Sequence, residues 1–213
     1  MIYLRRSLSV IVLLALFNSG ASAWALPSMG VAVVGAGTLE NYNQSTTSRT
    51  SLISNHREFG FPGGGLLVDF DLGSFQLQSG LLYLQHKYGN SEFQFDVTEQ
   101  TIDLPILLRY KIFPMLSIGA GVYAARFVGH QTVFLMNSGT VGNTLVVDEP
   151  YPSSMDYGFL LSAALAIPVG FYDVVADGRY AQGLKNLALD PTNNSLKRNE
   201  FQFFAGIRLG LGI

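Results

Sequence analysis

The feature that most constrains this chain is a two-residue alternation of apolar and polar side chains, recurring in segments of strand length. In residues 199–213 the odd-numbered positions from Phe201 onward are apolar, while Glu200, Gln202 and Arg208 lie at even-numbered positions. Residues 102–112 repeat the pattern. Because successive side chains of a strand point to opposite faces, each segment predicts a strand with one apolar and one polar face.

Eight such segments follow one another along the chain, separated by turn residues. Their connections are alternately long and short, and outer-membrane barrels have long extracellular loops and short periplasmic turns. A soluble antiparallel sheet also alternates, but it has no reason to keep this rhythm. The expected strands are 28–38, 63–72, 75–87, 99–112, 115–128, 156–168, 171–183 and 199–212. The expected long loops are 39–62, 88–98, 129–155 and 184–198, and the short turns Gly73-Ser74, Phe113-Pro114 and Val169-Gly170.

The predicted fold class is therefore all-β: an eight-stranded antiparallel up-and-down transmembrane β-barrel in the cell outer membrane, with both termini periplasmic. Composition agrees, since charged residues make up 13% of the chain and hydrophobic residues 48%. Yet the longest uninterrupted apolar run, Val10 to Phe17, is far shorter than the roughly 20 residues of a membrane-spanning helix. Strands are expected to cross the membrane.

The N-terminus is expected to be a secretory signal peptide, residues 1–23, followed by a barrel domain, 24–213. Arg5 and Arg6 form the basic region, Leu8 to Phe17 the apolar core, and Ala21-Ser22-Ala23 the cleavage site, with cleavage after Ala25 as an alternative. Its removal would take two basic residues and no acidic residue from an already negative chain, which disfavours a nucleic-acid partner. With no cysteine, the chain has no lipid-attachment residue, disulfide or thiolate metal site.

Alternation also assigns side chains to faces. The interior of eight strands is just filled by side chains, so the inward charges predict a packed polar plug in which Arg109, Arg179 and Arg208 pair with nearby carboxylates. The expected interior polar network is Asp103, Arg109, Lys111, Asp177, Arg179, Glu200 and Arg208. The expected lipid-facing residues are Ile102, Leu104, Ile106, Leu108, Phe201, Phe203, Ile207, Leu209 and Leu211.

Two functional alternatives remain open beside a non-enzymatic scaffold: a narrow porin-like channel and a lipid-modifying enzyme. The only histidines, His56, His86 and His130, fall in or beside the expected loops, where single histidines are usually solvated. No spacing pairs a nucleophile with a base and an orienting acid. The glycines of residues 119–124 match a loose dinucleotide fingerprint, but they lie inside an expected strand. We therefore expect no catalytic residue, cofactor or metal site.

Residues 102–110, residues 177–186 and the closing stretch 199–211 resemble the PorT-like outer-membrane β-barrel family. The resemblance implies an eight-stranded barrel in the outer membrane of a Gram-negative bacterium, and some members of that family serve protein secretion and gliding. Together the sequence predicts a protein for envelope integrity, adhesion or docking. Its expected partners are outer-membrane lipid, lipopolysaccharide and a protein bound through the loops. The sequence gives no oligomeric state.

Overall fold

The structure, a computed structural model, describes residues 28–46, 56–57, 59–90, 95–136, 143–147, 155–187 and 194–211. The expected signal peptide lies outside these ranges, so residues 1–23 remain a prediction. The described secondary structure consists of strands joined by turns. The strands are β1 (Ser28–Thr46), β2 (His56–Arg57), β3 (Phe59–Leu72), β4 (Phe75–Asn90), β5 (Phe95–Phe113), β6 (Leu116–Met136), β7 (Asn143–Val147), β8 (Met155–Val169), β9 (Tyr172–Gly183) and β10 (Asn194–Leu211).

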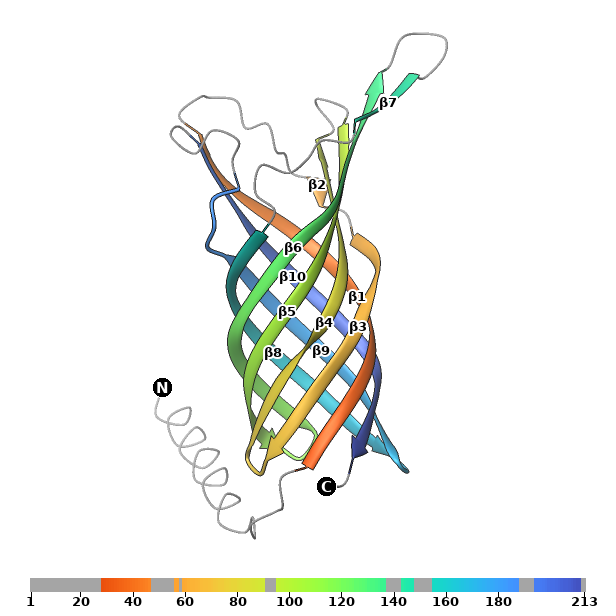
Figure 1. Ribbon diagram of the computed structural model, residues 1–213, viewed down its shortest axis with the longest axis vertical. Coiled ribbons are helices and arrows are strands. Elements are labelled where there is room, and N and C mark those ends of the chain that lie inside the picture. The colour runs from red at the N-terminus through yellow and green to blue at the C-terminus, as the bar shows by residue number, and fades with distance from the viewer. Residues whose placement is uncertain are drawn as a thin grey trace, which may run out of the picture.

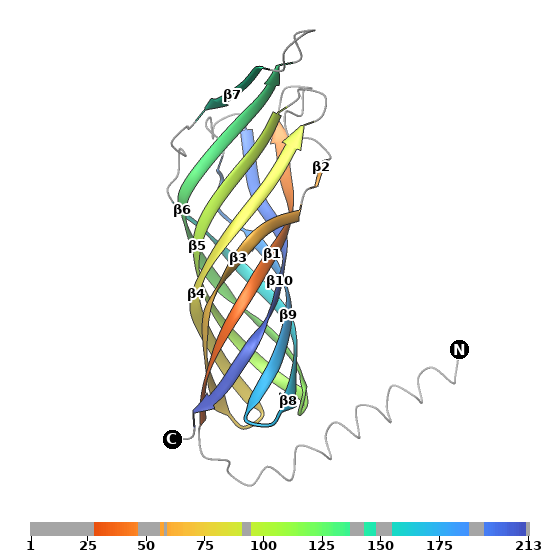
Figure 2. The same ribbon diagram turned by 90° about the vertical axis from the view of Figure 1, so that its right-hand side faces the viewer.

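Eight long strands close into an up-and-down barrel, which confirms the predicted fold class. Each pairs antiparallel with its neighbours along the chain. The first and last strands then pair from Met29 with Leu211 to Thr46 with Asn194, which closes the sheet. The short strands β2 and β7 add to β4 and β6 outside this circuit. Figures 1 and 2 show the strands tilted about a common axis.

Three two-residue turns lie at one end of the barrel, called here the short-turn end. Gly73 and Gly170 occupy the first positions of two of these turns with φ of 81° and 67°, a left-handed conformation that is common in tight hairpins and that glycine adopts without strain. Two turns lie one residue later than predicted, at 114–115 and 170–171, because Phe113 pairs with Leu116 and Val169 with Tyr172. β1 begins and β10 ends at this same end (Figure 1).

At the opposite, loop end the strands run further than predicted, so parts of the expected loops are strand. β6 has 21 residues, and β1 continues through the polar stretch 39–46 while paired with β10. Residues 40–46 carry polar side chains at nearly every position of the sequence and show no apolar alternation, but backbone pairing needs no apolar side chains. The strand extensions, with β7 at their margin, project beyond the closed part of the barrel (Figure 2).

The barrel exterior is apolar along most of its length. All the residues expected to face lipid point outward, with exposed fractions from 38% for Ile102 to 52% for Phe201. Ring pairs stand towards both ends: Phe75 with Tyr110 near the short turns, at 5.4 Å between centroids, and Tyr180 with Phe201 further up, at 5.1 Å. Such an exterior suits the hydrocarbon core of a bilayer bounded by aromatic girdles.

Charged side chains at outward strand positions gather at the loop end. Among the side chains described, they are Lys87, Arg126 and Lys197, and all three are cations. The described residues include no helix long and apolar enough to cross a membrane.

Candidate functional site in the barrel interior

The inward side chains form three layers along the barrel axis. A charged group near the short turns is called here the lower cluster, and a second group near the loop end the upper cluster. Between them lies an apolar layer. The sequence predicted a polar plug, and the structure divides that polar interior in two.

Asp177 on β9 is the centre of the lower cluster. Its Oδ2 binds the guanidinium of Arg109 and lies 2.7 Å from Nε of Arg179, while the hydroxyl of Ser162 donates to its Oδ1 at 2.9 Å. Arg179 also donates from Nη2 to the side-chain oxygen of Gln78 at 2.8 Å. These contacts join β4, β5, β8 and β9 across the lumen, so the two arginines are held in place from several sides.

The lower cluster continues to the other side of the barrel through Asp69 on β3. Asp69 accepts a hydrogen bond from the amide of Gln78 at 2.6 Å, and its Oδ2 lies 3.1 Å from Nε of Arg208. Arg208 then donates from Nη1 to Asp173 at 2.9 Å, near the short turns. Beside them, Lys111 pairs with Asp71. Each arginine expected to pair with a carboxylate therefore contacts one in the structure.

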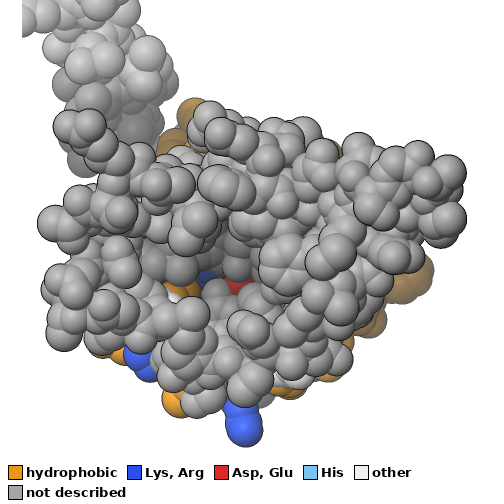
Figure 3. All heavy atoms as spheres, turned by 90° about the horizontal axis from the view of Figure 1, so that it is seen from above, with side chains coloured by type: hydrophobic (Ala, Val, Ile, Leu, Met, Phe, Trp, Pro, Cys, Tyr) orange, Lys and Arg blue, Asp and Glu red, His pale blue; other side chains and the backbone are white. Residues whose placement is uncertain are grey.

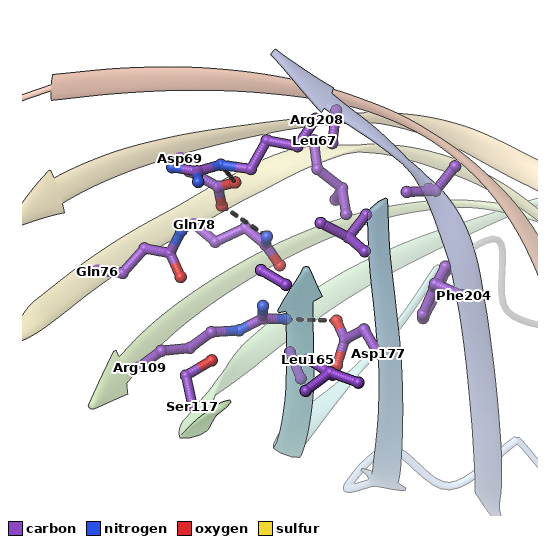
Figure 4. Close-up of a pocket in the computed structure, with 15 residues that line it drawn as sticks. Leu67, Asp69, Gln76, Gln78, Arg109, Ser117, Leu165, Asp177, Phe204 and Arg208 are labelled. Carbon is purple, nitrogen blue, oxygen red and sulfur yellow. Dashed lines mark hydrogen bonds and ion pairs between the residues drawn. The ribbon is translucent and has the colours of Figure 1, made fainter. Parts of the chain in front are cut away.

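A cavity lies within the lower cluster (Figure 4). Its volume is about 40 Å³, and a second cavity of about 170 Å³ extends to the residues of the turn at 114–115. The two cavities share the wall residues Gln76, Ser117, Ala166 and Arg208, so they adjoin one another between the short-turn end and the middle of the barrel.

The apolar layer lies between this space and the upper cluster, and it consists of two groups of buried side chains. One group comes from β1, β3, β4 and β10 and the other from β5, β6, β8 and β9, so each of the eight long strands contributes to the layer. The guanidinium of Arg179 stacks over the ring of Phe204 at 4.3 Å, where the layer meets the lower cluster. The layer consists of Ala32, Val34, Ala36, Leu67, Leu82, Leu84, Leu107, Tyr123, Ala125, Leu160, Ala181 and Phe204.

Arg198 is the centre of the upper cluster. Its guanidinium lies 3.3 Å from Asp156, 3.8 Å from Asp103 and 4.0 Å from Glu200, and 5.6 Å from the ring of Tyr123. The hydroxyl of Tyr123 donates to Asp156 at 2.9 Å. Seen from the loop end, the molecule is hollowed, and basic and acidic side chains show within the hollow (Figure 3).

His86 belongs to this cluster, which corrects its interpretation as a solvated loop residue. Its ring nitrogens lie 2.9 Å from Glu200 through Nδ1 and 2.9 Å from the hydroxyl of Thr101 through Nε2. The hydroxyl of Thr101, the imidazole of His86 and the carboxylate of Glu200 are thus arranged in the order of a catalytic triad, with a nucleophile, a base and an orienting acid. All three residues are fully buried, and Arg198 also contacts Nε2 at 3.2 Å. The hydroxyl of Thr101 is therefore shielded from solvent.

The predicted interior residues are distributed between both clusters. Asp103 and Glu200 lie in the upper cluster, Arg109, Asp177 and Arg179 in the lower one, and Lys111 and Arg208 beside the short turns. Sequence reasoning missed His86, Arg198, Asp156, Asp69 and Gln78. The alternation pattern could have identified two of them, because Arg198 lies two positions before Glu200, and His86 lies eight positions after Gln78 on the same face of its strand. The prediction instead assigned His86 to a strand end and Arg198 to a loop. The side chains of His56 and His130 are outside those described.

Comparison with known proteins gives structural neighbours and no sequence relative. No protein-family profile matches the chain, and no curated protein matches it in sequence. The crystal structure of Neisserial surface protein A has a TM-score of 0.44 and 12% identity, and the match covers 87% of this chain and 99% of that one. The crystal structure of OprG of Pseudomonas aeruginosa has a TM-score of 0.49 and 10% identity, and the match covers 87% of this chain and 97% of that one. The crystal structure of a major outer membrane protein of Thermus thermophilus has a TM-score of 0.48 and 12% identity, and the match covers 88% of this chain and 100% of that one.

At these identities the fold assignment rests on the strand pairing of the chain itself. Within the described residues, no group of three or more histidine, cysteine, aspartate or glutamate residues could hold a metal ion.

Proposed function

We propose that this chain is a non-enzymatic, integral outer-membrane protein whose closed barrel anchors exposed segments for envelope integrity, adhesion or docking of a partner. The observation that carries the proposal is the apolar layer. Ions cross an apolar constriction poorly because they lose their hydration there, and apolar side chains from all eight long strands line the lumen between the two ion-paired clusters. The exterior and the strand extensions at the loop end are then the surfaces that can contact a partner.

The distribution of exterior charge supports an orientation with the loop end outward. Lys87, Arg126 and Lys197 stand at that end, and cations at a membrane surface are attracted to anionic lipid. The phosphates of lipopolysaccharide supply that charge in the outer leaflet. With the loop end outward, the start of β1 and the end of β10 lie at the periplasm, where removal of a signal peptide after Ala23 would leave the mature terminus.

Single-channel recording in planar lipid bilayers tests the proposal. Protein that migrates on gels as a folded, heat-modifiable barrel should give no stepwise conductance, because the apolar layer blocks the lumen. Steps at the nanosiemens scale would overturn it and establish the alternative, a small porin-like channel. That alternative draws support from the two adjoining cavities between the short-turn end and the apolar layer.

A lipid-modifying enzyme is the less favoured alternative, based on Thr101, His86 and Glu200. A lipid A mass spectrum that is unchanged on expression of the protein would agree with a non-enzymatic scaffold, and a new acylation or deacylation product would contradict it. A PorT-like role in secretion is one form of partner docking, and the resemblance in sequence is its support.

A further inference from the structure

Arg126 lies on the outward face of β6, at the loop end of the apolar exterior. In the strand pairing it stands between Ile102 on β5 and Met155 on β8, and all three side chains are exposed. Val128, two positions nearer the loop end, is outward and 49% exposed. Arg126 is therefore a cation with apolar neighbours on its own strand and on both adjacent strands.

No described carboxylate is placed to neutralise this arginine. Among the side chains that the structure describes, every carboxylate lies in the interior or beside the short turns. A guanidinium presents a planar set of donors that matches the oxygens of a phosphate. The phosphates of lipid headgroups lie at the level of the membrane surface, so such a phosphate complements Arg126 in both charge and geometry.

The outward face of β6 between Arg126 and the middle of the barrel carries small side chains. Ala124 and Ala120 alternate there with Val122, and all three are exposed. The strands on either side carry larger side chains at the paired outward positions, so a shallow furrow follows β6, called here the β6 furrow. Its two walls are Leu104, Ile106 and Leu108 on β5 and Tyr157, Phe159 and Leu161 on β8.

The length of the β6 furrow suits one acyl chain. At about 3.3 Å per residue and a tilt of about 40°, the six residues from Arg126 to Ala120 descend roughly 15 Å into the bilayer. This depth is about half of the hydrocarbon thickness of a bilayer, which is the share of a single leaflet. A lipid whose phosphate binds Arg126 can therefore lay one acyl chain along the furrow.

A second outward cation stands two strands beyond β8. The strand order β6, β8, β9, β10 places Lys197 about 14 Å from Arg126 across the sheet, at about 4.8 Å per strand. Tyr157 and Leu184 stand between them and are both exposed. The backbone amide of Leu184 donates to the carbonyl of Tyr157 at 3.0 Å, which continues the pairing of β8 and β9. Two separated cations suit a headgroup with more than one phosphate.

We propose that this face of the barrel binds one molecule of lipid A, the phosphorylated glycolipid of the outer leaflet. One phosphate binds Arg126, a second lies towards Lys197, and an acyl chain lies in the β6 furrow. A phospholipid with a single phosphate satisfies only one of the two cations. The inference rests on the proposed orientation, with the loop end outward, and deepens the proposed function by giving lipopolysaccharide a site.

Native mass spectrometry of the whole barrel in non-ionic detergent tests the site. Titration with lipid A should give a single adduct per barrel that saturates. Dephosphorylated lipid A, which keeps the acyl chains, and phosphatidylglycerol, which has one phosphate, should each bind at least about tenfold more weakly. Purified protein has no sidedness, so failure of this titration is distinct from failure of the proposed scaffold, which conductance detects.

Two cations at the loop end provide a matched pair of variants. Arg126→Gln should weaken lipid A binding about tenfold or more, because a charge-assisted contact with phosphate is lost. Lys87→Gln should leave binding unchanged. Lys87 is also an outward cation at the loop end, but its outward neighbours are the polar residues Gln85 on its own strand and Thr98 on β5.

Two outward alanines test the β6 furrow in the same way. Ala124→Leu fills the furrow and should weaken lipid A binding about fourfold or more, which corresponds to lost contact with about one methylene group. Ala205→Leu makes the same change on the outward face of β10 and should leave binding unchanged. Heat-modifiable migration on gels establishes that each variant is folded.

Several results would overturn the proposal. Absence of a saturable adduct would show that the barrel has no lipid A site. Equal binding of phosphatidylglycerol would show a surface that attracts anionic lipid in general, and equal binding of dephosphorylated lipid A would show apolar contact alone. Equal losses in Arg126→Gln and Lys87→Gln would show diffuse surface charge. If Arg126→Gln does not fold, the two leucine variants decide, and equal binding by them overturns the site.

Discussion

A single guanidinium organises the loop-end half of the barrel interior. Arg198 on β10 is fully buried and contacts carboxylates from β5, β8 and its own strand, together with His86 from β4. Several carboxylates thus depend on one arginine. Because a charge removed from water is stabilised only by its partners, each would be left in a low-dielectric space without it.

Replacement of this arginine should therefore cost much of the stability of the barrel. We expect Arg198→Met to lower the free energy of unfolding by about 3–5 kcal/mol, the usual cost of removing one partner from a buried ionic group. Urea unfolding in lipid vesicles, followed by heat-modifiable gel migration, measures the loss. The matched control is Lys197→Met, one position earlier on the outward face, which should change stability by less than about 0.5 kcal/mol. Equal effects of the two substitutions would contradict a central role for Arg198.

Which face a charged residue occupies could be predicted from the sequence, but which partner it contacts could not. Parity alone placed Arg109, Asp177 and Arg179 together inside. Partner choice depends on strand register and barrel stagger, which bring Arg179 to Gln78 across 101 residues of sequence. The same cause hid the contact of His86 with Glu200. The division into clusters was missed because the apolar layer uses inward residues, such as Leu107, that alternation alone does not distinguish from the polar ones.

At the scale of the strand, two requirements set where each element ends. Within the apolar belt, a strand needs alternating side chains and a pairing partner on both sides, because lipid supplies no hydrogen bonds. Beyond the belt, water accepts polar side chains on both faces, and pairing alone continues the strand, as between Glu40 and Thr46 of β1. Periodicity therefore located all eight long strands but ended several of them too early.

The depth of an outward residue in the belt should determine the cost of placing a charge there. Ile106 lies in the middle of β5 and points outward, whereas Leu211 is the last residue of β10 at the short-turn end. We expect Ile106→Arg to destabilise the barrel in lipid by about 2–4 kcal/mol and Leu211→Arg by about 0–1 kcal/mol, since the side chain near the interface reaches the headgroups. The same urea titration in lipid vesicles measures both, and equal costs would contradict the position assigned to the belt.

On the scale of the whole molecule, closure of the sheet and the rhythm of its connections fix which segments share a side of the membrane. All three two-residue turns lie at one end, and the outward cations among the described strand side chains lie at the other. Because the closed sheet has its short turns at one end and its long connections at the other, all strands share one orientation across the bilayer. The proposed function of the loop end requires that this end face the outside of the cell.

Cysteine labelling can measure this orientation because the chain has no cysteine of its own. In intact cells, a membrane-impermeant maleimide should label Lys197→Cys, since that side chain is exposed at the loop end. Ser74→Cys, in a short turn, should be labelled only after the outer membrane is permeabilised. Leu104→Cys, which points outward in the middle of the belt, should resist the water-soluble reagent in both conditions and react with a lipid-soluble one. Labelling of Ser74→Cys in intact cells would show the inverse orientation, and labelling of Leu104→Cys by the water-soluble reagent would show that the apolar exterior does not face lipid.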